Sequence, residues 1–527
     1  MKIRHICYCI SCWALLSVGC YDDKGNNDYR PLNTIEVQPF GEDAQPSAAF
    51  GDTIRYYSAL HFASGTGEGM KLTYEWTFAG KRIGNEPDLF WIVDTVAEGY
   101  VILRVTDEET GLVYSNHKSL RIESPYKSRG WIVLAEKDGK SSLSFIREMM
   151  VDYVEDDLGV SLVLENQIFP DIYKEINGED LGTMPLEVME HLSTVAPGAI
   201  LVLQQGHPGG VDIDGNTFQR DIYLQETFMD QMLPLGFNPV KATWMHWLDV
   251  IENEDGRLFT RLKYTDQLFN SGYFITEPVM AGQDEIRGHL LDFDWTQSGW
   301  TLVHDRGTKE KPQNRLAALL DCKNLWGDSY VGRADILPEP DGEWSANFVP
   351  LNDMGENELV YFKGTAGFAS GKYFMIMKTP DGRYLQQTVG MGRMDEKLYY
   401  NYNDLSMTEM PSGFDYENSL LYLLPTNTDT YLVLAQGADL YYYNWSSPED
   451  GIKTYWHFDA PVKAMAMSTK TPTFPQLGCA LENGQFVILN VKMMKNRPEN
   501  QRLYWQTPSN VNLGNAVSMI YKTSDRL

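Results

Sequence analysis

The chain has 527 residues, of which 43% are hydrophobic and 12% aromatic, and its 72 acidic and 44 basic side chains give a formal net charge of −28 at pH 7. That length exceeds what one hydrophobic core usually organises, so two or more domains are expected. An acidic surface cannot displace the counterions of a phosphate backbone, which argues against a nucleic-acid partner. It favours solubility and mutual repulsion at a crowded surface, and it leaves open the attraction of cationic ligands such as basic peptides.

Residues 1–19 have the pattern of an export signal. Lys2 and Arg4 give a basic start, and the apolar run Ile6–Val18 follows it. This run is shorter than the ~20 apolar residues that a membrane-spanning helix needs. It therefore predicts a signal peptide that is removed from the mature chain.

The leader ends at Ser17-Val18-Gly19-Cys20, which resembles a bacterial lipobox, where a small residue precedes a cysteine that is diacylated and becomes the new N-terminus. Two or three acyl chains, at about 0.8 kcal/mol per buried methylene, hold a protein stably on a membrane. Tyr21–Lys24 resembles the acidic export signal that sends lipoproteins of Bacteroidetes to the outer face of the outer membrane. The sequence therefore predicts lipidation at Cys20 and an acidic tether over 20–32; a secretory peptide with an incidental Cys20 is the alternative.

The cysteines do not indicate a disulfide framework. Cys7, Cys9 and Cys12 leave with the leader, so only Cys322 and Cys479 remain in the folded body. Two buried free thiols are favoured for them, and a pair formed in an oxidising compartment is the alternative.

Short alternating strands with turn signals fill residues 33–124. Lys71–Phe78 places alternate apolar residues, including Trp76, on one face, and Tyr100–Val105 alternates in the same way before a turn over 107–111. This spacing predicts an immunoglobulin-like β-sandwich with a buried tryptophan and without a disulfide.

Three stretches of this region resemble the PKD-like lipoproteins of Bacteroidetes: Cys20–Val37, the Tyr74-Glu75-Trp76 strand and the hairpin Gly99–Gly111. The resemblance covers the first quarter of the chain. It implies a C-terminal region of the β-propeller type. It also implies an accessory partnership with SusC/SusD-type transporters that import glycans or oligopeptides.

The polar stretch Ser124–Trp131 marks the expected domain boundary. Beyond it, over residues 125–527, apolar strands recur in pairs around Gly- or Asp-Gly-type turns. These pairs begin at Gly130, Gly198, Lys372, Thr430 and Leu477. Tandem four-stranded blades produce such hairpins at intervals of about 40 to 60 residues, so an all-β chain is predicted in which a β-propeller of seven blades follows the sandwich.

The ends and insertions of the propeller also have sequence signals. Asn515–Lys522 is expected to be the last strand, which closes the ring beside the first blade. Pro185–Pro197 and Ile146–Gly159 have helical rather than alternating periodicity, and they predict helices inserted on one face of the propeller.

No catalytic or metal-binding motif is found in the sequence. It has no HExxH, no His/Cys spacing for zinc, no nucleophile elbow around Ser370 and no phosphate loop at Gly364–Tyr373. The polar loop 207–216 contains Asp212 and Asp214 but lacks the later glutamate of a calcium-binding hand, so a turn is predicted there. No cofactor or metal is expected.

The densest aromatic run is Tyr441–Trp445. In a strand, Tyr441, Tyr443 and Trp445 share one face and Tyr442 lies on the other. Packing between blades is the favoured fate of these rings. Stacking of Tyr441, Tyr443 and Trp445 on a sugar ring or a peptide side chain is the alternative, and these residues are the sequence-based candidates for ligand binding.

Two functions follow as hypotheses. The first is a surface-exposed, non-catalytic outer-membrane lipoprotein that captures or holds a glycan or oligopeptide for nutrient uptake by a SusC/SusD-type transporter. The second is a propeller-fold glycosidase or peptidase anchored at the cell surface, since two carboxylates can meet from distant positions. A purely structural scaffold is a third possibility.

Overall fold

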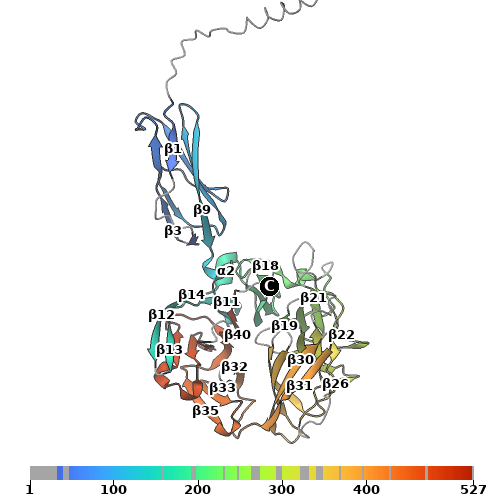
Figure 1. The fold of residues 1–527 in the computed structure, drawn as a ribbon. Helices are drawn as coiled ribbons and strands as arrows, with labels where there is room; N and C mark the ends of the chain where they lie inside the picture. The colour runs from blue at the N-terminus through green and yellow to red at the C-terminus, as the bar shows by residue number, and fades with distance from the viewer. Residues whose placement is uncertain are drawn as a thin grey trace, which may run out of the picture. The chain divides into compact units, whose positions relative to one another are not determined.

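The computed structural model describes residues 32–524, apart from 39–46, 51, 157, 192–197, 229–231, 246–247, 263–272, 292–299, 321–331, 340–347, 367–369, 395–396, 426–428 and 469–472. The predicted leader, the lipidation site at Cys20, the tether before Leu32, and Cys322 therefore lie outside the described residues. The chain divides into two compact units, Met1–Glu123 and Ser124–Leu527 (Figure 1). Within the described ranges, no helix is long and apolar enough to cross a bilayer.

The first unit is a β-sandwich. Its larger sheet has the strand order β2-β9-β8-β5-β6, and two-stranded sheets β1-β4 and β3-β7 complete it. The strands are β1 (Ile35–Gln38), β2 (Ser47–Ala49), β3 (Thr53–Tyr56), β4 (Ala59–Phe62), β5 (Leu72–Phe78), β6 (Lys81–Gly84), β7 (Leu89–Ile92), β8 (Glu98–Asp107) and β9 (Val113–Glu123).

The core of the sandwich follows the predicted alternation. On β5, Trp76 and Phe78 are buried, and on β8 the buried residues Val101, Leu103 and Val105 alternate with exposed or half-buried ones. All five belong to one hydrophobic cluster. The indole Nε1 of Trp76 donates to the Glu86 carbonyl at 2.9 Å, so the buried ring leaves no polar atom unsatisfied. The predicted sandwich with a buried tryptophan is confirmed.

The second unit is built from seven consecutive antiparallel sheets, which we call blades 1 to 7 (Figure 1). Blade 3 has three described strands and the others have four. Blades 1 to 4 are β40 (Asn515–Lys522), β10 (Gly130–Lys137), β11 (Lys140–Arg147) and β14 (Gln167–Phe169); β15 (Pro185–His191), β16 (Ala199–Gln204), β17 (Val211–Ile213) and β18 (Arg220–Tyr223); β19 (Pro239–Trp244), β20 (Leu248–Asn253) and β21 (Leu258–Leu262); and β24 (Gly288–Leu290), β25 (Trp300–Gly307), β26 (Pro312–Leu320) and β27 (Asp335–Ile336).

The remaining blades repeat this arrangement. Blades 5 to 7 are β28 (Glu358–Ala366), β29 (Ser370–Lys378), β30 (Tyr384–Met394) and β31 (Lys397–Glu409); β32 (Leu420–Pro425), β33 (Thr430–Gln436), β34 (Asp439–Asn444) and β35 (Ile452–His457); and β36 (Val462–Met467), β37 (Gln476–Leu481), β38 (Phe486–Asn490) and β39 (Leu503–Gln506). Further elements lie between or beside the blades. Two of them are extra hairpins, β12 (Met150–Asp156) with β13 (Gly159–Leu164) and β22 (Met280–Ala281) with β23 (Asp284–Glu285). The others are the helix α2 (Ile172–Asn177) and the 3₁₀ turns η1 (Pro125–Lys127), η2 (Leu224–Thr227), η4 (Pro448–Asp450), η5 (Met494–Asn496) and η6 (Glu499–Gln501).

Hydrophobic clusters join each blade to the next and close the ring. Side chains of blades 1 and 2 share one cluster, and further clusters join blades 2 and 3, 3 and 4, 4 and 5, 5 and 6, and 6 and 7. A seventh cluster packs Ala480 and Ile488 of blade 7 against Trp131 and Val133 of blade 1. Because both faces of every blade are covered, its middle strands are continuous apolar runs, as in β10. The chain is all-β, a sandwich followed by a β-propeller.

The last strand completes the first blade, as predicted. β40 spans Asn515–Lys522 and pairs antiparallel with β10 over the register Trp131↔Tyr521 to Glu136↔Asn515. The N-terminal part of the propeller thus supplies three strands of blade 1, and the C-terminal part supplies the fourth. A sheet edge that would otherwise be open is closed in this way.

The two predicted helices are wrong, because both segments form strands. Pro185–His191 is the first strand of blade 2, and a β-bulge between Pro185 and Glu187 together with neighbouring blades on both sides buries every third residue instead of every second. Ile146–Gly159 is the end of β11 followed by β12, whose apolar residues are exposed. In both cases the rule that apolar residues share one buried face does not hold.

Candidate ligand-binding site

The sequence-based candidates Tyr441, Tyr443 and Trp445 lie on one face, as predicted, and pack between blades 5 and 6. Tyr443 is fully buried, and its hydroxyl donates to Gln386 Oε1 at 2.7 Å. Trp445 Nε1 donates to Thr388 Oγ1 at 2.8 Å. The packing alternative therefore describes Tyr443 and Trp445, which have no open ring face for a ligand. Whether the half-buried Tyr441 contacts a ligand stays a prediction.

Cys479 is buried and free, and burial raises the pKa of its thiol. A buried thiol of this kind packs as a small hydrophobe and is a poor nucleophile.

The polar loop of blade 2 divides into a turn and a buried charge. Asp214 Oδ1 accepts hydrogen bonds from the backbone N–H groups of Asn216 and Thr217 at 2.8 and 2.9 Å, which is the predicted turn. Asp212 instead lies in β17, and its carboxylate is 2.8 Å from His191 Nε2. Within the described part of the chain, no group of His, Cys, Asp and Glu side chains has the arrangement of a metal site.

Asp212 belongs to a buried ion cluster between blades 2 and 3. The guanidinium of Arg261 lies 3.5 Å from Asp212 Oδ2 and donates to Asp249 Oδ2 at 2.7 Å. Burial opposes ionisation of Asp212, but His191 and Arg261 outweigh it and lower the pKa of that carboxyl. The cluster contains two acids and one permanent cation in a site closed to solvent, so its role is to join blades.

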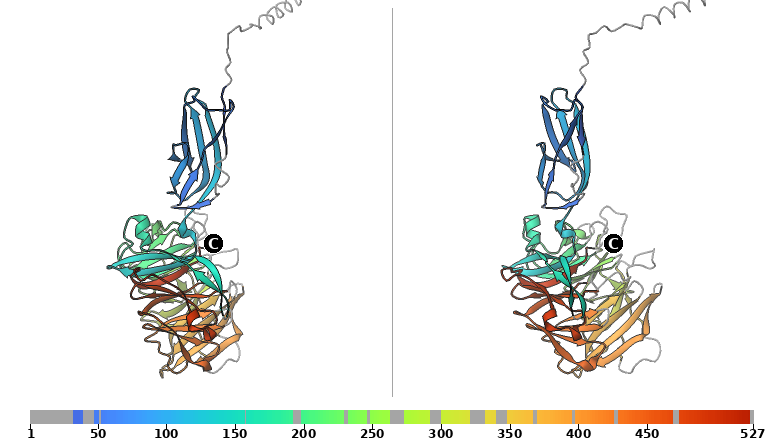
Figure 2. Two further views of the ribbon diagram at one scale, coloured as in Figure 1. Left: turned by 90° about the vertical axis from the view of Figure 1, so that its left-hand side faces the viewer. Right: turned by 60° about the vertical axis from the view of Figure 1, so that its left-hand side comes forward.

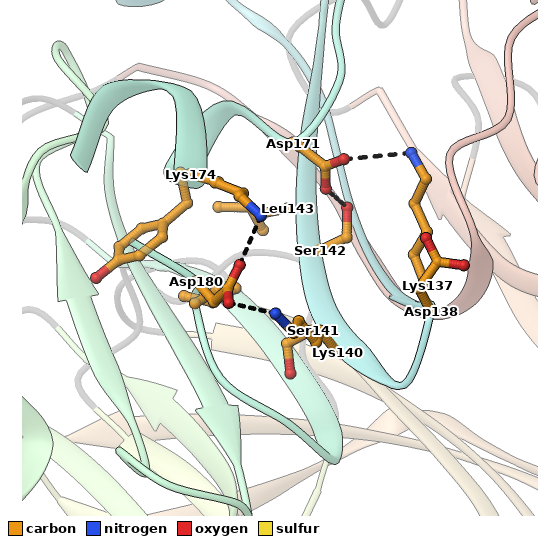
Figure 3. Close-up of a pocket in the computed structure, with 11 residues that line it drawn as sticks. Lys137, Asp138, Lys140, Ser141, Ser142, Leu143, Asp171, Lys174 and Asp180 are labelled. Carbon is orange, nitrogen blue, oxygen red and sulfur yellow. Dashed lines mark hydrogen bonds and ion pairs between the residues drawn. The ribbon is translucent and has the colours of Figure 1, made fainter. Parts of the chain in front are cut away.

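A small polar pocket lies beside α2 in blade 1 (Figure 3). Its volume is about 190 Å³. Asp180 Oδ1 and Oδ2 lie 2.8 and 2.5 Å from the ammonium groups of Lys174 and Lys140, and Lys137 Nζ lies 3.2 Å from Asp171 Oδ2. Hydrogen bonds from Lys140 and Lys174 lower the pKa of Asp180 to about 2. Every lysine of this pocket is paired with a carboxylate, so the charges of the lysines are balanced within the pocket. Its volume is below the ~300–1,000 Å³ range of ligand sites.

A larger pocket of about 700 Å³ opens between blades 1 and 7, and we call it the seam pocket. This volume is within the ~300–1,000 Å³ range of ligand sites. The residues that line it are Lys127, Ser128, Arg129, Glu148, Met150, Tyr153, Leu162, Thr473, Phe474, Thr523 and Ser524.

The seam pocket has an aromatic side and a charged side. The ring centroids of Tyr153 and Phe474 are 5.9 Å apart, and the ring planes are tilted by 45°. Glu148 Oε2 accepts hydrogen bonds from Tyr521 Oη and Gln476 Nε2, both at 3.1 Å, which hold the carboxylate in place. Arg129 is exposed at the pocket. Aromatic rings beside fixed charges and hydroxyls can bind a peptide side chain or a sugar.

The hairpin β12–β13 lies at the side of the propeller (Figures 1 and 2). Its residues Met150, Tyr153 and Leu162 line the seam pocket. β13 is fixed to blade 7, where Ser161 Oγ accepts from Asn490 Nδ2 at 3.2 Å, and Leu162 and Leu164 are buried in the cluster that joins blades 7 and 1. β12 projects from this support. Its residues Met150, Val151 and Tyr153 are exposed by 47, 47 and 53%.

Sequence reasoning missed the seam pocket. Tyr153 and Phe474 are far apart in the chain and meet only because β40 brings blade 7 beside blade 1. The available signal is the segment Met149–Asp157, where apolar and acidic residues are mixed, but its periodicity predicts a helix.

The fold and the pocket define a class of protein: a sandwich joined to a β-propeller, with an open pocket where the propeller closes. A model of the PKD-like family matches residues 20–185, so the match starts at Cys20, covers the sandwich and extends to the first residue of β15. The PKD-like resemblance is confirmed over these residues.

Three solved structures illustrate the comparisons with known folds. A quinonprotein alcohol dehydrogenase-like protein from Bacteroides thetaiotaomicron VPI-5482 has 11% identity and a TM-score of 0.38, with 92% of this chain and 99% of that chain covered. The N-terminal domain of Nup159 has 11% identity and a TM-score of 0.29, covering 67% and 93%. PorZ of Porphyromonas gingivalis, described as a surface component of the type-IX secretion system, has 12% identity and a TM-score of 0.16, covering 89% and 59%.

These TM-scores are low, so the propeller assignment rests on the sheet order and on the clusters between blades. No curated protein matches the sequence.

Proposed function

We propose that this protein is a non-catalytic outer-membrane lipoprotein on the cell surface, where it captures or holds a nutrient ligand, a glycan or an oligopeptide, for a SusC/SusD-type transporter. The observation that carries the proposal is the PKD-like match, which begins at Cys20 directly behind a leader with a lipobox-like end. In such a protein the acyl chains on Cys20 supply the anchor.

The propeller supports the binding part of the proposal. The seam pocket has the volume of a ligand site, an aromatic pair and fixed polar groups. The carboxylate of Glu148 is held by hydrogen bonds from Tyr521 and Gln476, so it offers a fixed acceptor to a ligand. A tethered binder needs only modest affinity, because the tether raises the effective concentration of its cargo near a transporter.

The anchor is tested by Cys20→Ala in the native host. We expect the variant to be absent from the membrane fraction and to detach from the cell surface, because it has no sulfur to acylate. The matched control is Cys12→Ala, which removes a leader cysteine and keeps the acceptor. Membrane fractionation and mass spectrometry of the N-terminal peptide provide the measurement. An unmodified Cys20 in the wild type contradicts the proposal.

The partnership is tested by affinity purification of the lipidated wild-type protein from solubilised outer membranes. SusC- and SusD-type proteins are expected among the co-purified chains and absent when Cys20→Ala is purified. A purified protein that hydrolyses oligosaccharides or peptides with turnover overturns the non-catalytic assignment.

A further inference from the structure

Among the described residues of the propeller, the hairpin β12–β13 has a dense group of exposed apolar side chains. Over residues 149–163 the following large apolar residues are exposed: Met149, Met150, Val151, Tyr153, Val154, Val160 and Val163. A soluble protein rarely leaves so many apolar side chains together in water unless they form a contact surface.

The same hairpin offers an open strand edge. β12 pairs with β13 from Met150↔Leu164 to Asp156↔Gly159, and among the described residues it pairs with no other strand. The outer edge of β12 therefore presents backbone N–H and C=O groups that an extended chain can pair with. A peptide backbone has the repeat that matches this edge, and a glycan does not.

The charges of the hairpin are of one sign. Asp152, Glu155, Asp156 and Asp157 lie in the segment 149–164, which contains no Lys, Arg or His. An extended occupant that places basic side chains opposite these acids gains attraction, and an acidic occupant is repelled. Where β12 starts, Arg129 lies at the seam pocket and can pair with a terminal carboxylate.

We propose that the free edge of β12 and the adjoining seam pocket bind a free, extended oligopeptide in which apolar and basic residues alternate. The peptide adds a strand to β12, with its basic side chains on the face of Asp152 and its apolar side chains on the face of Tyr153. One apolar side chain packs against the Tyr153–Phe474 pair, and the terminal carboxylate pairs with Arg129. This inference rests on the proposed capture function and selects the oligopeptide over the glycan.

The probe is a fluorescent synthetic peptide of the same length as β12, in which Lys and Val alternate and the C-terminal carboxylate is free. Binding to the purified full-length protein is measured by fluorescence anisotropy. We expect saturable binding that weakens with added salt. N-methylation of alternate residues on one edge of the peptide abolishes binding, and methylation on the other edge leaves it unchanged, because only one edge pairs with β12. Equal effects of both methylations overturn the strand pairing.

Protein variants locate the site. Tyr153→Ser and Asp152→Lys are each expected to weaken binding by roughly tenfold or more. Both residues are exposed, so the fold tolerates the changes. The matched controls are Tyr57→Ser and Glu356→Lys, which change an exposed tyrosine and an exposed acid elsewhere, and they keep wild-type affinity. Equal affinities in site and control variants overturn the proposal.

Two further arms separate the remaining outcomes. A C-terminally amidated peptide is expected to bind more weakly than the free acid; equal binding overturns the assignment to a free oligopeptide. Competition by maltooligosaccharide at the same site overturns the choice of peptide over glycan. If the peptide does not bind while the lipidated protein still co-purifies with a transporter, this inference fails and the proposed function stands. If the peptide binds and Cys20 is unmodified, the proposed function fails and the assignment of a peptide site stands.

Discussion

Lys522 connects the closure of the ring with the start of the propeller. It is fully buried, and its ammonium group donates to the carbonyls of Tyr126 and Ser128 at 3.0 and 3.2 Å. The neighbouring carboxylate of Glu190 accepts from the backbone N–H of Thr523 at 2.7 Å. A buried ammonium is costly unless such acceptors surround it. Burial lowers the pKa of Lys522 to about 8, although Glu190 and Asp214 raise it.

This pKa sets a pH dependence of stability. Between about 8 and the ordinary value of 10.5, the unfolded chain binds more protons at this position than the folded chain. Lys522 is therefore expected to increase the free energy of unfolding of the wild type as pH rises through that window, by on the order of 3 kcal/mol at most. Lys522→Met removes the gain. Thermal unfolding of both proteins at a series of pH values measures it, and parallel pH profiles would refute the assignment.

Arg261 is expected to be the most sensitive residue of the buried ion cluster. Arg261→Met leaves Asp212 and Asp249 without their permanent cation, and we expect a loss of about 3–5 kcal/mol at neutral pH. Since the carboxylate of Asp212 contributes stability only when ionised, the deficit of the variant should shrink as pH falls toward the ordinary range of an aspartate. Denaturant unfolding at neutral and mildly acidic pH tests this. Arg383→Met, which removes a partner of Asp381 at an exposed pair, is the comparison and should cost less.

At the scale of elements, the middle strands of the blades could be predicted from the sequence, but the strands β12 and β15 could not. Hairpins such as β29–β30 and β33–β34 have two apolar strands around a tight turn, and that pattern has one interpretation. β15 was missed because it is covered on both sides and bulged. β12 was missed because its apolar side chains are exposed, so burial does not explain their spacing.

The candidate site was less predictable than the fold. Aromatic density singled out Tyr441–Trp445, but two of its three predicted ligand-binding side chains fill the interface between blades. The seam pocket combines residues of blade 1, blade 7 and an additional hairpin. The local sequence does not indicate which distant segments lie side by side once the ring is closed, so the seam pocket could be identified only in the three-dimensional structure.

β40 is the element whose loss is expected to have the largest effect. A chain truncated before Asn515 leaves blade 1 with three strands. It also removes the contact between Tyr521 and Trp131, whose ring centroids lie 4.8 Å from each other. We expect the propeller to become sensitive to protease while a sandwich fragment ending near Glu123 resists it. Limited proteolysis with mass spectrometry measures this, and a truncated chain with an intact protease-resistant propeller would contradict the role of β40.

At the scale of the whole molecule, two units with separate cores predict two unfolding events. Trp76 lies in the core of the sandwich, and Trp300 lies in the cluster that joins blades 4 and 5. Trp76→Ala should lower the midpoint of one calorimetric transition and Trp300→Ala that of the other, each by a loss of about 3–5 kcal/mol. A single transition that both variants shift equally would show that the units unfold together.

The joining of the first blade by the final strand has a consequence for biogenesis. A polypeptide that emerges from a ribosome or a translocon segment by segment leaves the edge of β10 unprotected until residues 515–522 arrive. The nascent propeller is thus vulnerable to misassembly for almost the whole period of its synthesis, and holdase chaperones have a defined target in that edge.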